Sequence, residues 1–233
     1  MADITKLRVL CLHGYGQNKN TFMSKIGGFR KETRNLLDLE FIDAPHLLPS
    51  PTCCKNGIQE VDAENDTTAR AWWYSMSDDS LKGLELPHYT VVFEESRKLV
   101  EETWTARGPF DGIFGFSQGG MMAALVLALQ ELGKTQTNFR FGVIISSSVS
   151  RSLPLCSDIY CRPNLVTVPT LHIIGEADQV IPKEQSVEEM QYFASASAVF
   201  HPGGHYLPTS GQCKLQYMGF LKQQLQRKRD CNA

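Results

Sequence analysis

The sequence predicts an α/β fold in which a mostly parallel central sheet is covered by helices on both faces. Three observations support this prediction. Apolar stretches of strand length alternate along the chain with longer stretches of helical length. One strand-to-helix junction carries the pattern Gly-x-Ser-x-Gly at residues 115–119. The other polar residues suited to catalysis follow predicted strands, where the carboxyl edge of a parallel sheet collects functional groups.

The first half of the chain is expected to begin with an apolar strand at Leu7–Leu12. A helix is predicted within Asn20–Leu37 and a second strand at Leu39–Ile42. An excursion of about residues 45–88 follows, and its part rich in prolines and acidic residues, which includes the adjacent Cys53 and Cys54, is interpreted as loop. A helix over Tyr89–Ala106 is expected to lead back to the sheet.

The second half continues the alternation of strands and helices. A strand at Asp111–Phe116 runs into a largely buried apolar helix at Gln118–Leu132. The remaining predicted elements are strands at Phe141–Ser146, Thr170–Ile174 and Ala198–His201, and helices at Lys183–Phe193 and Gly211–Gln226. We expect one domain over residues 1–233, with its core at about residues 6–226, because α/β folds of this length commonly form a single domain.

The pattern around Ser117 is typical of the nucleophile elbow of an α/β-hydrolase. A serine hydroxyl attacks a carbonyl only if it protrudes from a tight turn, and such a turn leaves no room for side chains at Gly115 and Gly119. The pattern also occurs by chance, so its context matters. Here an apolar strand precedes the serine and an apolar helix follows it, which is the order that the elbow requires.

An elbow of this kind requires an acid and then a histidine later in the chain. Asp178 lies just beyond the predicted strand Thr170–Ile174, and His205 lies in a glycine-rich loop after the last predicted strand. These two residues are the candidate acid and general base, with Ser117 as nucleophile. Glu176 is a competing acid, and Asp178 could instead cap a helix and His205 could be an unpartnered loop residue.

Two backbone amides are expected to form the oxyanion hole, which stabilises the negative charge of the tetrahedral intermediate. One is the amide of Gln118, directly after the nucleophile. The other is the amide of Tyr15, in the loop after the first strand, where the flanking Gly14 and Gly16 let the backbone bend toward the serine.

The substrate pocket is less defined by the sequence. Trp72 and Trp73 either line it or pack the excursion onto the sheet, and both interpretations remain open. Tyr206 follows the candidate base and Ile181 follows the candidate acid, so both are further candidates for contacts with substrate.

Several motifs together resemble the FSH family of serine hydrolases, over nearly the whole chain from Lys6 to about Leu225. They are the segment at residues 13–18, the Arg-Ala-Trp-Trp-Tyr cluster at residues 70–74, Gly-Phe-Ser-Gln-Gly at the elbow and Gly-Gly-His at residues 203–205. The elbow alone also resembles acyl-protein thioesterases and carboxylesterases, and the double tryptophan separates the two groups. The resemblance implies the same three residues, Ser117, Asp178 and His205, as catalytic triad.

The resemblance further implies a hydrolase with little or no separate lid domain that cleaves carboxylic esters or thioesters, often of acyl chains. The expected mechanism is acyl transfer through the serine, which needs no metal and no organic cofactor. An acyl-thioesterase or protein deacylase is an alternative within the same class. A different alternative is a ligand-binding or interaction protein, because this fold is also used with a slow or silent triad.

Composition narrows the range of partners and locations. A net charge of −2 gives no basis for general binding to nucleic acid, and we interpret the basic cluster at residues 227–229 as a solvated helix end. We expect neither a secretory signal nor a transmembrane helix, because residues 1–6 are not an apolar segment of secretory length and no apolar run reaches the length of a transmembrane helix. Seven cysteines without metal-like spacing indicate reduced thiols in a cytoplasmic protein.

Overall fold

A single parallel sheet organises the fold. The computed structural model of the protein describes residues 5–48, 68–74, 86–150, 153, 156–209 and 211–231. Six strands form the sheet in the order β2-β1-β5-β6-β7-β8, and every pairing between them is parallel. They are β1 (Leu7–Leu12), β2 (Leu37–Ile42), β5 (Gly112–Phe116), β6 (Phe141–Ile145), β7 (Thr170–Gly175) and β8 (Ala196–His201). The predicted parallel sheet is therefore confirmed.

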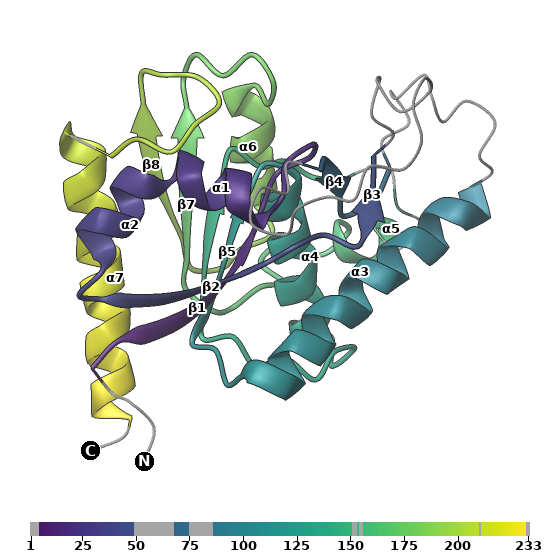
Figure 1. The fold of residues 1–233 in the computed structure, drawn as a ribbon, viewed down its shortest axis with the longest axis horizontal. Helices are drawn as coiled ribbons and strands as arrows, with labels where there is room; N and C mark the ends of the chain where they lie inside the picture. The colour runs from purple at the N-terminus through teal and green to yellow at the C-terminus, as the bar shows by residue number, and fades with distance from the viewer. Residues whose placement is uncertain are drawn as a thin grey trace.

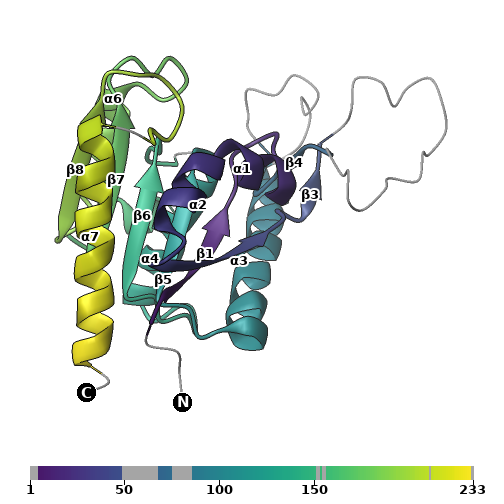
Figure 2. The same cartoon turned by 60° about the vertical axis from the view of Figure 1, so that its left-hand side comes forward.

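Helices cover both faces of this sheet, and each face has its own apolar core (Figures 1 and 2). One face packs against α1 (Lys19–Lys25), α2 (Gly27–Thr33) and α7 (Gly211–Asp230). The other packs against α3 (Leu86–Arg107), α4 (Gln118–Glu131) and the short α5 (Cys156–Ile159). A further helix, α6 (Lys183–Met190), packs beside β7. Burial on both sides explains why the central strands are apolar at almost every position.

The strand order places two loops side by side at the carboxyl edge. From β1 the chain moves outward to β2, and it then returns to β5 on the other side of β1. The ends of β1 and β5 are paired, with Leu12 opposite Gly115. The loop after β1 therefore lies next to the turn after β5. In open parallel sheets such a reversal of direction is where ligands bind.

Several predicted bounds were wrong for local reasons. The helix predicted within Asn20–Leu37 is two helices that meet at Ile26, and Leu37 already belongs to β2. Asn18 starts α1 through a reciprocal capping box with Thr21, which a search for apolar periodicity does not register. Among the other differences, α3 starts at Leu86, β8 starts two residues earlier than predicted, α6 ends at Met190 and α7 extends to Asp230.

The excursion contains short elements that the sequence did not predict. β3 (His46–Leu47) and β4 (Arg70–Ala71) form an antiparallel pair, with His46 opposite Ala71. Strands of two residues are too short to show a period in the sequence. Cys53 and Cys54, together with the acidic run, lie outside the described residues.

The basic end of α7 corrects a second expectation. Arg227 and Arg229 are exposed, as a solvated helix end requires, but Lys228 is buried. Its Nζ donates hydrogen bonds to the Asp111 carboxylate and to the carbonyl oxygen of Lys6, each over 2.8 Å. The same Asp111 oxygen accepts the backbone N–H of Arg8. This ion pair therefore ties α7 to the beginnings of β1 and β5.

Replacing Lys228 with methionine is expected to lower the free energy of unfolding by about 3 kcal/mol, because the partly buried Asp111 carboxylate loses its cation. Urea denaturation at pH 7 measures this change. Lys222→Met, on an exposed position of the same helix, is the matched control and should have little effect. An equal loss in both variants would contradict a specific role of the ion pair.

Candidate active site

Ser117 connects β5 to α4 in a backbone conformation that few residues adopt. Its φ is 54° and its ψ is −123°, and its side chain is half-buried rather than enclosed. A Cβ atom on Gly115 would collide with the carbonyl oxygen of Gly119, and one on Gly119 would collide with the carbonyl oxygens of Leu12 and His13. Both glycines are therefore required by close backbone contacts, as the elbow pattern predicts.

His205 and Asp178 meet through a short hydrogen bond. The Nδ1 atom of His205 lies 2.8 Å from Oδ2 of Asp178. The loops that carry them are joined by backbone hydrogen bonds, because Glu176 N–H donates to His201 O and Ala177 N–H donates to Gly203 O. The competing acid, Glu176, is exposed, whereas Asp178 is buried. The geometry therefore favours Asp178 as the partner of the histidine.

The environment of Asp178 keeps its carboxylate ionised. Burial acts to raise the pKa of this group, but hydrogen bonds from Ile181 N–H, from His205 and from Val180 N–H outweigh burial and lower the pKa below its usual value. The two amides both bond to Oδ1, over 2.9 Å and 2.8 Å, which leaves Oδ2 directed at the histidine. The carboxylate is thus fixed in orientation as well as in charge.

The histidine ring lies over the residue that precedes the nucleophile. The rings of His205 and Phe116 have centroids 4.8 Å apart. Phe116 is the last residue of β5, and Ser117 follows it directly. The structure therefore brings the loop after β8, which carries His205, to the carboxyl end of β5, where the predicted nucleophile Ser117 lies.

The loop after β1 lies against the same serine. A Cβ atom on Gly14 would come within 3.2 Å of the Cβ of Ser117. The loop is held by hydrogen bonds from Gly14 N–H to the Gln17 side chain and from Gly16 N–H to Arg70 O. Tyr15 lies between these two fixed positions. The amide of Gln118 is the first N–H of α4, one of the four at a helix N-terminus that have no acceptor within the helix.

The side chain of Gln118 has a structural role that the sequence did not indicate, because it holds the backbone at Trp72 and Trp73. Its Oε1 accepts the N–H of Trp72 over 2.9 Å, and its Nε2 donates to Trp73 O over 2.6 Å. Trp72 also donates its indole N–H to His13 O and accepts a hydrogen bond from Ser96 at its own carbonyl. We refer to residues 68–74 as the tryptophan segment. Gln118 and His13 together attach this segment to the site.

The ring of His13 fixes the other side of the loop after β1. Its Nε2 accepts the N–H of Ala44, so the proton must be on Nδ1, which donates to Gly14 O over 2.8 Å. Burial lowers the pKa of His13, which keeps the ring neutral in this arrangement. His13 is a polar residue directly after the apolar strand Leu7–Leu12. This position was the signal in the sequence that could have indicated its role in holding the loop.

The predicted pocket residues differ in their exposure. Trp72 and Trp73 are 0% and 3% exposed and belong to the apolar core, so their contacts favour the packing interpretation. A role for them in lining the pocket stays a prediction. Tyr206 is 51% exposed and Ile181 is buried. Both remain candidates for contact with substrate.

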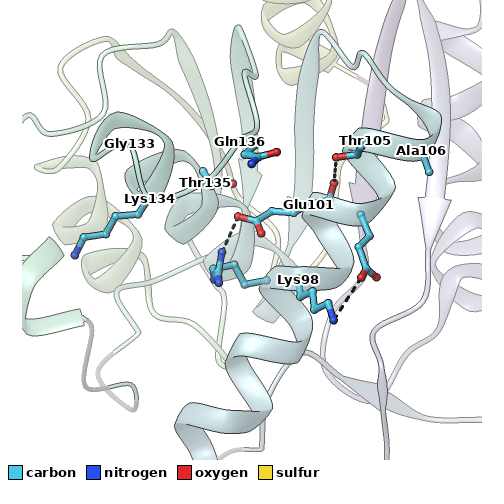
Figure 3. Close-up of a pocket in the computed structure, with 10 residues that line it drawn as sticks. Lys98, Glu101, Thr105, Ala106, Gly133, Lys134, Thr135 and Gln136 are labelled. Carbon is cyan, nitrogen blue, oxygen red and sulfur yellow. Dashed lines mark hydrogen bonds and ion pairs between the residues drawn. The ribbon is translucent and has the colours of Figure 1, made fainter.

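A depression at the opposite edge of the sheet has a different character. It has a volume of about 740 Å³ and lies between the second half of α3 and residues 133–136 (Figure 3). Its charged groups on α3 pair with one another, because Arg97 bonds to Glu101 and Lys98 to Glu102. It lies at the end of α3 that leads into β5, which is the amino edge of the sheet. It is therefore far from the carboxyl edge, where Ser117 lies. We interpret it as a charged surface groove rather than as a substrate site.

The parallel sheet, the helices on both its faces and the strained serine between β5 and α4 define an α/β-hydrolase fold. The chain belongs to the serine hydrolase (FSH1) family, whose family model matches residues 1–217. The resemblance found in the sequence motifs is thereby confirmed.

Curated relatives carry the word esterase in their names. A Drosophila pseudoobscura protein, esterase GA18864, is 39% identical over 95% of this chain and 73% of its own length. Human esterase OVCA2 is 34% identical over 96% of this chain and 99% of its own length. These relatives support hydrolase activity.

Solved structures confirm the fold at lower identity. Arabidopsis thaliana SOBER1, as its L63A variant, superposes with a TM-score of 0.61 at 20% identity and covers 94% of this chain and 99% of its own. Zea mays acyl-protein thioesterase 2 has a TM-score of 0.60 at 18% identity, with 94% of each chain covered. Within the described residues, no helix is both long and apolar enough to span a membrane.

Proposed function

We propose that the protein is a serine esterase that cleaves carboxylic esters of acyl chains. The observation that carries the proposal is the hydrogen bond between His205 and the buried Asp178, with the histidine ring packed on the residue before Ser117. The names of the relatives support the ester as substrate class. The cytoplasmic location expected from the sequence remains part of this proposal.

The proposed reaction has two steps. The free ring nitrogen of His205 takes the proton of Ser117 as the serine oxygen bonds to the ester carbonyl carbon. The amides of Tyr15 and Gln118 stabilise the oxyanion. The bond to the alcohol oxygen then breaks, and His205 returns the proton to that oxygen. In the second step His205 takes a proton from water as the water oxygen bonds to the acyl carbon. The bond to the serine oxygen then breaks, His205 returns the proton to Ser117, and the acid is released.

Exposed apolar side chains next to the three catalytic loops support an acyl chain as the substrate group. Tyr15, Val180 and Tyr206 are 37%, 63% and 51% exposed. Tyr15 lies in the loop after β1, Val180 lies two residues after Asp178, and Tyr206 directly follows His205. Apolar groups at these positions are suited to contact an apolar chain as it enters the site.

A panel of p-nitrophenyl esters from acetate to decanoate tests the proposal, with the Ser117→Ala variant as the blank. We expect hydrolysis that depends on Ser117, and a kcat/KM that rises with chain length if the cleft is deep and apolar. An S-acylated peptide, tested in parallel, measures thioesterase activity. Rates equal to those of the blank at every length, with tight binding of an ester, would instead indicate a ligand-binding protein.

A further inference from the structure

Glu189 is a buried acidic residue in α6 that the proposed mechanism does not use. Its side chain is 0% exposed. Among the described residues, no Lys, Arg or His lies within ion-pair distance of its carboxyl group. Burial raises the pKa of Glu189 to about 8, against the opposing effect of a hydrogen bond from Ser147. The group is therefore mainly protonated at neutral pH.

Glu189 and its neighbour on the same helix both bond to one serine. The hydroxyl of Ser147 donates to Oε1 of Glu189 over 3.0 Å, and the hydroxyl of Ser186 donates to the carbonyl oxygen of Ser147 over 2.6 Å. Ser147 lies just after β6 and is buried. Its side chain and its backbone are therefore both held by α6.

Ser147 in turn lies against the first turn of α4. A Cβ atom on Gly120 would lie 2.8 Å from the Cβ of Ser147 and 3.1 Å from its hydroxyl oxygen. Gly120 donates its N–H to the carbonyl oxygen of Ser117 over 2.8 Å. Ser147, which α6 holds, therefore contacts α4 within one helical turn of Ser117.

The other end of this connection is the loop that holds Asp178. Helix α6 begins at Lys183, two residues after Ile181, whose N–H bonds to Asp178. Ser147 therefore lies between the helix that starts at the nucleophile and the helix that follows the acid. A change in the Glu189 contact would alter the separation of these two catalytic elements.

We propose that protonated Glu189 is a positioning residue, which acts with Ser186 to fix Ser147 between α4 and α6 and thereby sets the Asp178 loop relative to Ser117. This inference rests on the proposed function. It predicts that activity depends on the protonation state of a group that touches neither the substrate nor the reacting atoms.

The neighbours of Glu189 do not compensate its charge when it ionises. Among the described residues, the titratable group that interacts with it is Tyr160, directly after α5, and Tyr160 in turn interacts with Cys156 in α5 and Tyr192 after α6. Burial raises the pKa of Tyr160 well above its usual value and that of Cys156 to about 11, so these two groups stay neutral. An ionised Glu189 is therefore expected to move toward water and to loosen α6 from Ser147.

The pH dependence of kcat/KM for p-nitrophenyl butyrate between pH 6 and 10 tests this role, after subtraction of the Ser117→Ala rate. For the wild-type enzyme we expect a decline of at least about ten-fold above pH 8, as Glu189 ionises. Glu189→Gln preserves the neutral acceptor, so it should keep the pH 7 activity within about three-fold and lose the decline. Glu184→Gln, on an exposed position of α6, is the matched control and should keep the wild-type profile.

Two further variants remove the contact itself. Glu189→Leu cannot accept the Ser147 hydroxyl, and Ser147→Ala cannot donate it, so both should lower kcat about ten-fold at pH 7 with little change in KM. Persistence of the alkaline decline in Glu189→Gln would overturn the proposal, and so would full kcat in both of these variants. Absence of any hydrolysis above the blank would instead contradict the proposed function.

Discussion

Replacing Ser117 with alanine is expected to lower kcat for an activated ester by about four to six orders of magnitude. The substitution removes the oxygen that forms the acyl-enzyme, so only the oxyanion donors and substrate binding remain to accelerate direct attack by water. The same variant should no longer react with a fluorophosphonate probe, which phosphonylates an activated serine. Mass spectrometry of the labelled protein measures this directly.

Ser24→Ala is the matched control for this experiment, because Ser24 is an exposed serine on α1. It should keep both turnover and labelling. Labelling of Ser117→Ala at another residue, or turnover close to that of the wild type, would show that a different group is the nucleophile.

Asp178→Asn is expected to lower kcat about 10⁴-fold at neutral pH, with little change in stability. The N–H groups of Val180 and Ile181 both donate to Oδ1. In the variant they should select the amide oxygen, which turns the NH₂ group toward Nδ1 of His205. An NH₂ group donates, so it stabilises the tautomer with the proton on the other ring nitrogen. That tautomer cannot take a proton from Ser117.

Glu176→Gln separates this effect from a general loss of negative charge in the loop. Glu176 is exposed and two residues away, so its replacement should leave kcat nearly unchanged. A large loss in Glu176→Gln together with an active Asp178→Asn would assign the acid to Glu176. Far-UV circular dichroism of both variants checks that the fold is retained.

The sequence predicted the features of this protein that depend on short local patterns. Alternating apolar stretches gave the correct fold class, because strands buried on both faces cannot tolerate polar residues. The order of Ser117, Asp178 and His205 placed three groups at strand ends, and in a parallel sheet those ends share one edge. The hydrogen bond between Asp178 and His205 agrees with the predicted pairing, although the catalytic role of all three residues stays a prediction.

The features that the sequence did not predict depend on contacts between distant residues. Lys228 reads as one of three basic residues at a helix end, and only the position of Asp111 explains why it is buried. Glu189 likewise has the sequence context of a surface helix. The break between α1 and α2 lies at Ile26, whose φ of −97° and ψ of 21° depart from the helical conformation although buried apolar residues continue on either side of it.

The attachment of the tryptophan segment to Gln118 limits how this enzyme can be redesigned. The side chain of Gln118 bonds to the tryptophan segment, and the backbone amide of the same residue is proposed to stabilise the oxyanion. Shortening or exchanging this segment to broaden substrate range would also remove the contacts that hold Gln118 in place. Libraries aimed at new substrates should therefore leave Trp72 and Gln118 intact and vary the exposed rim at Tyr15, Val180 and Tyr206.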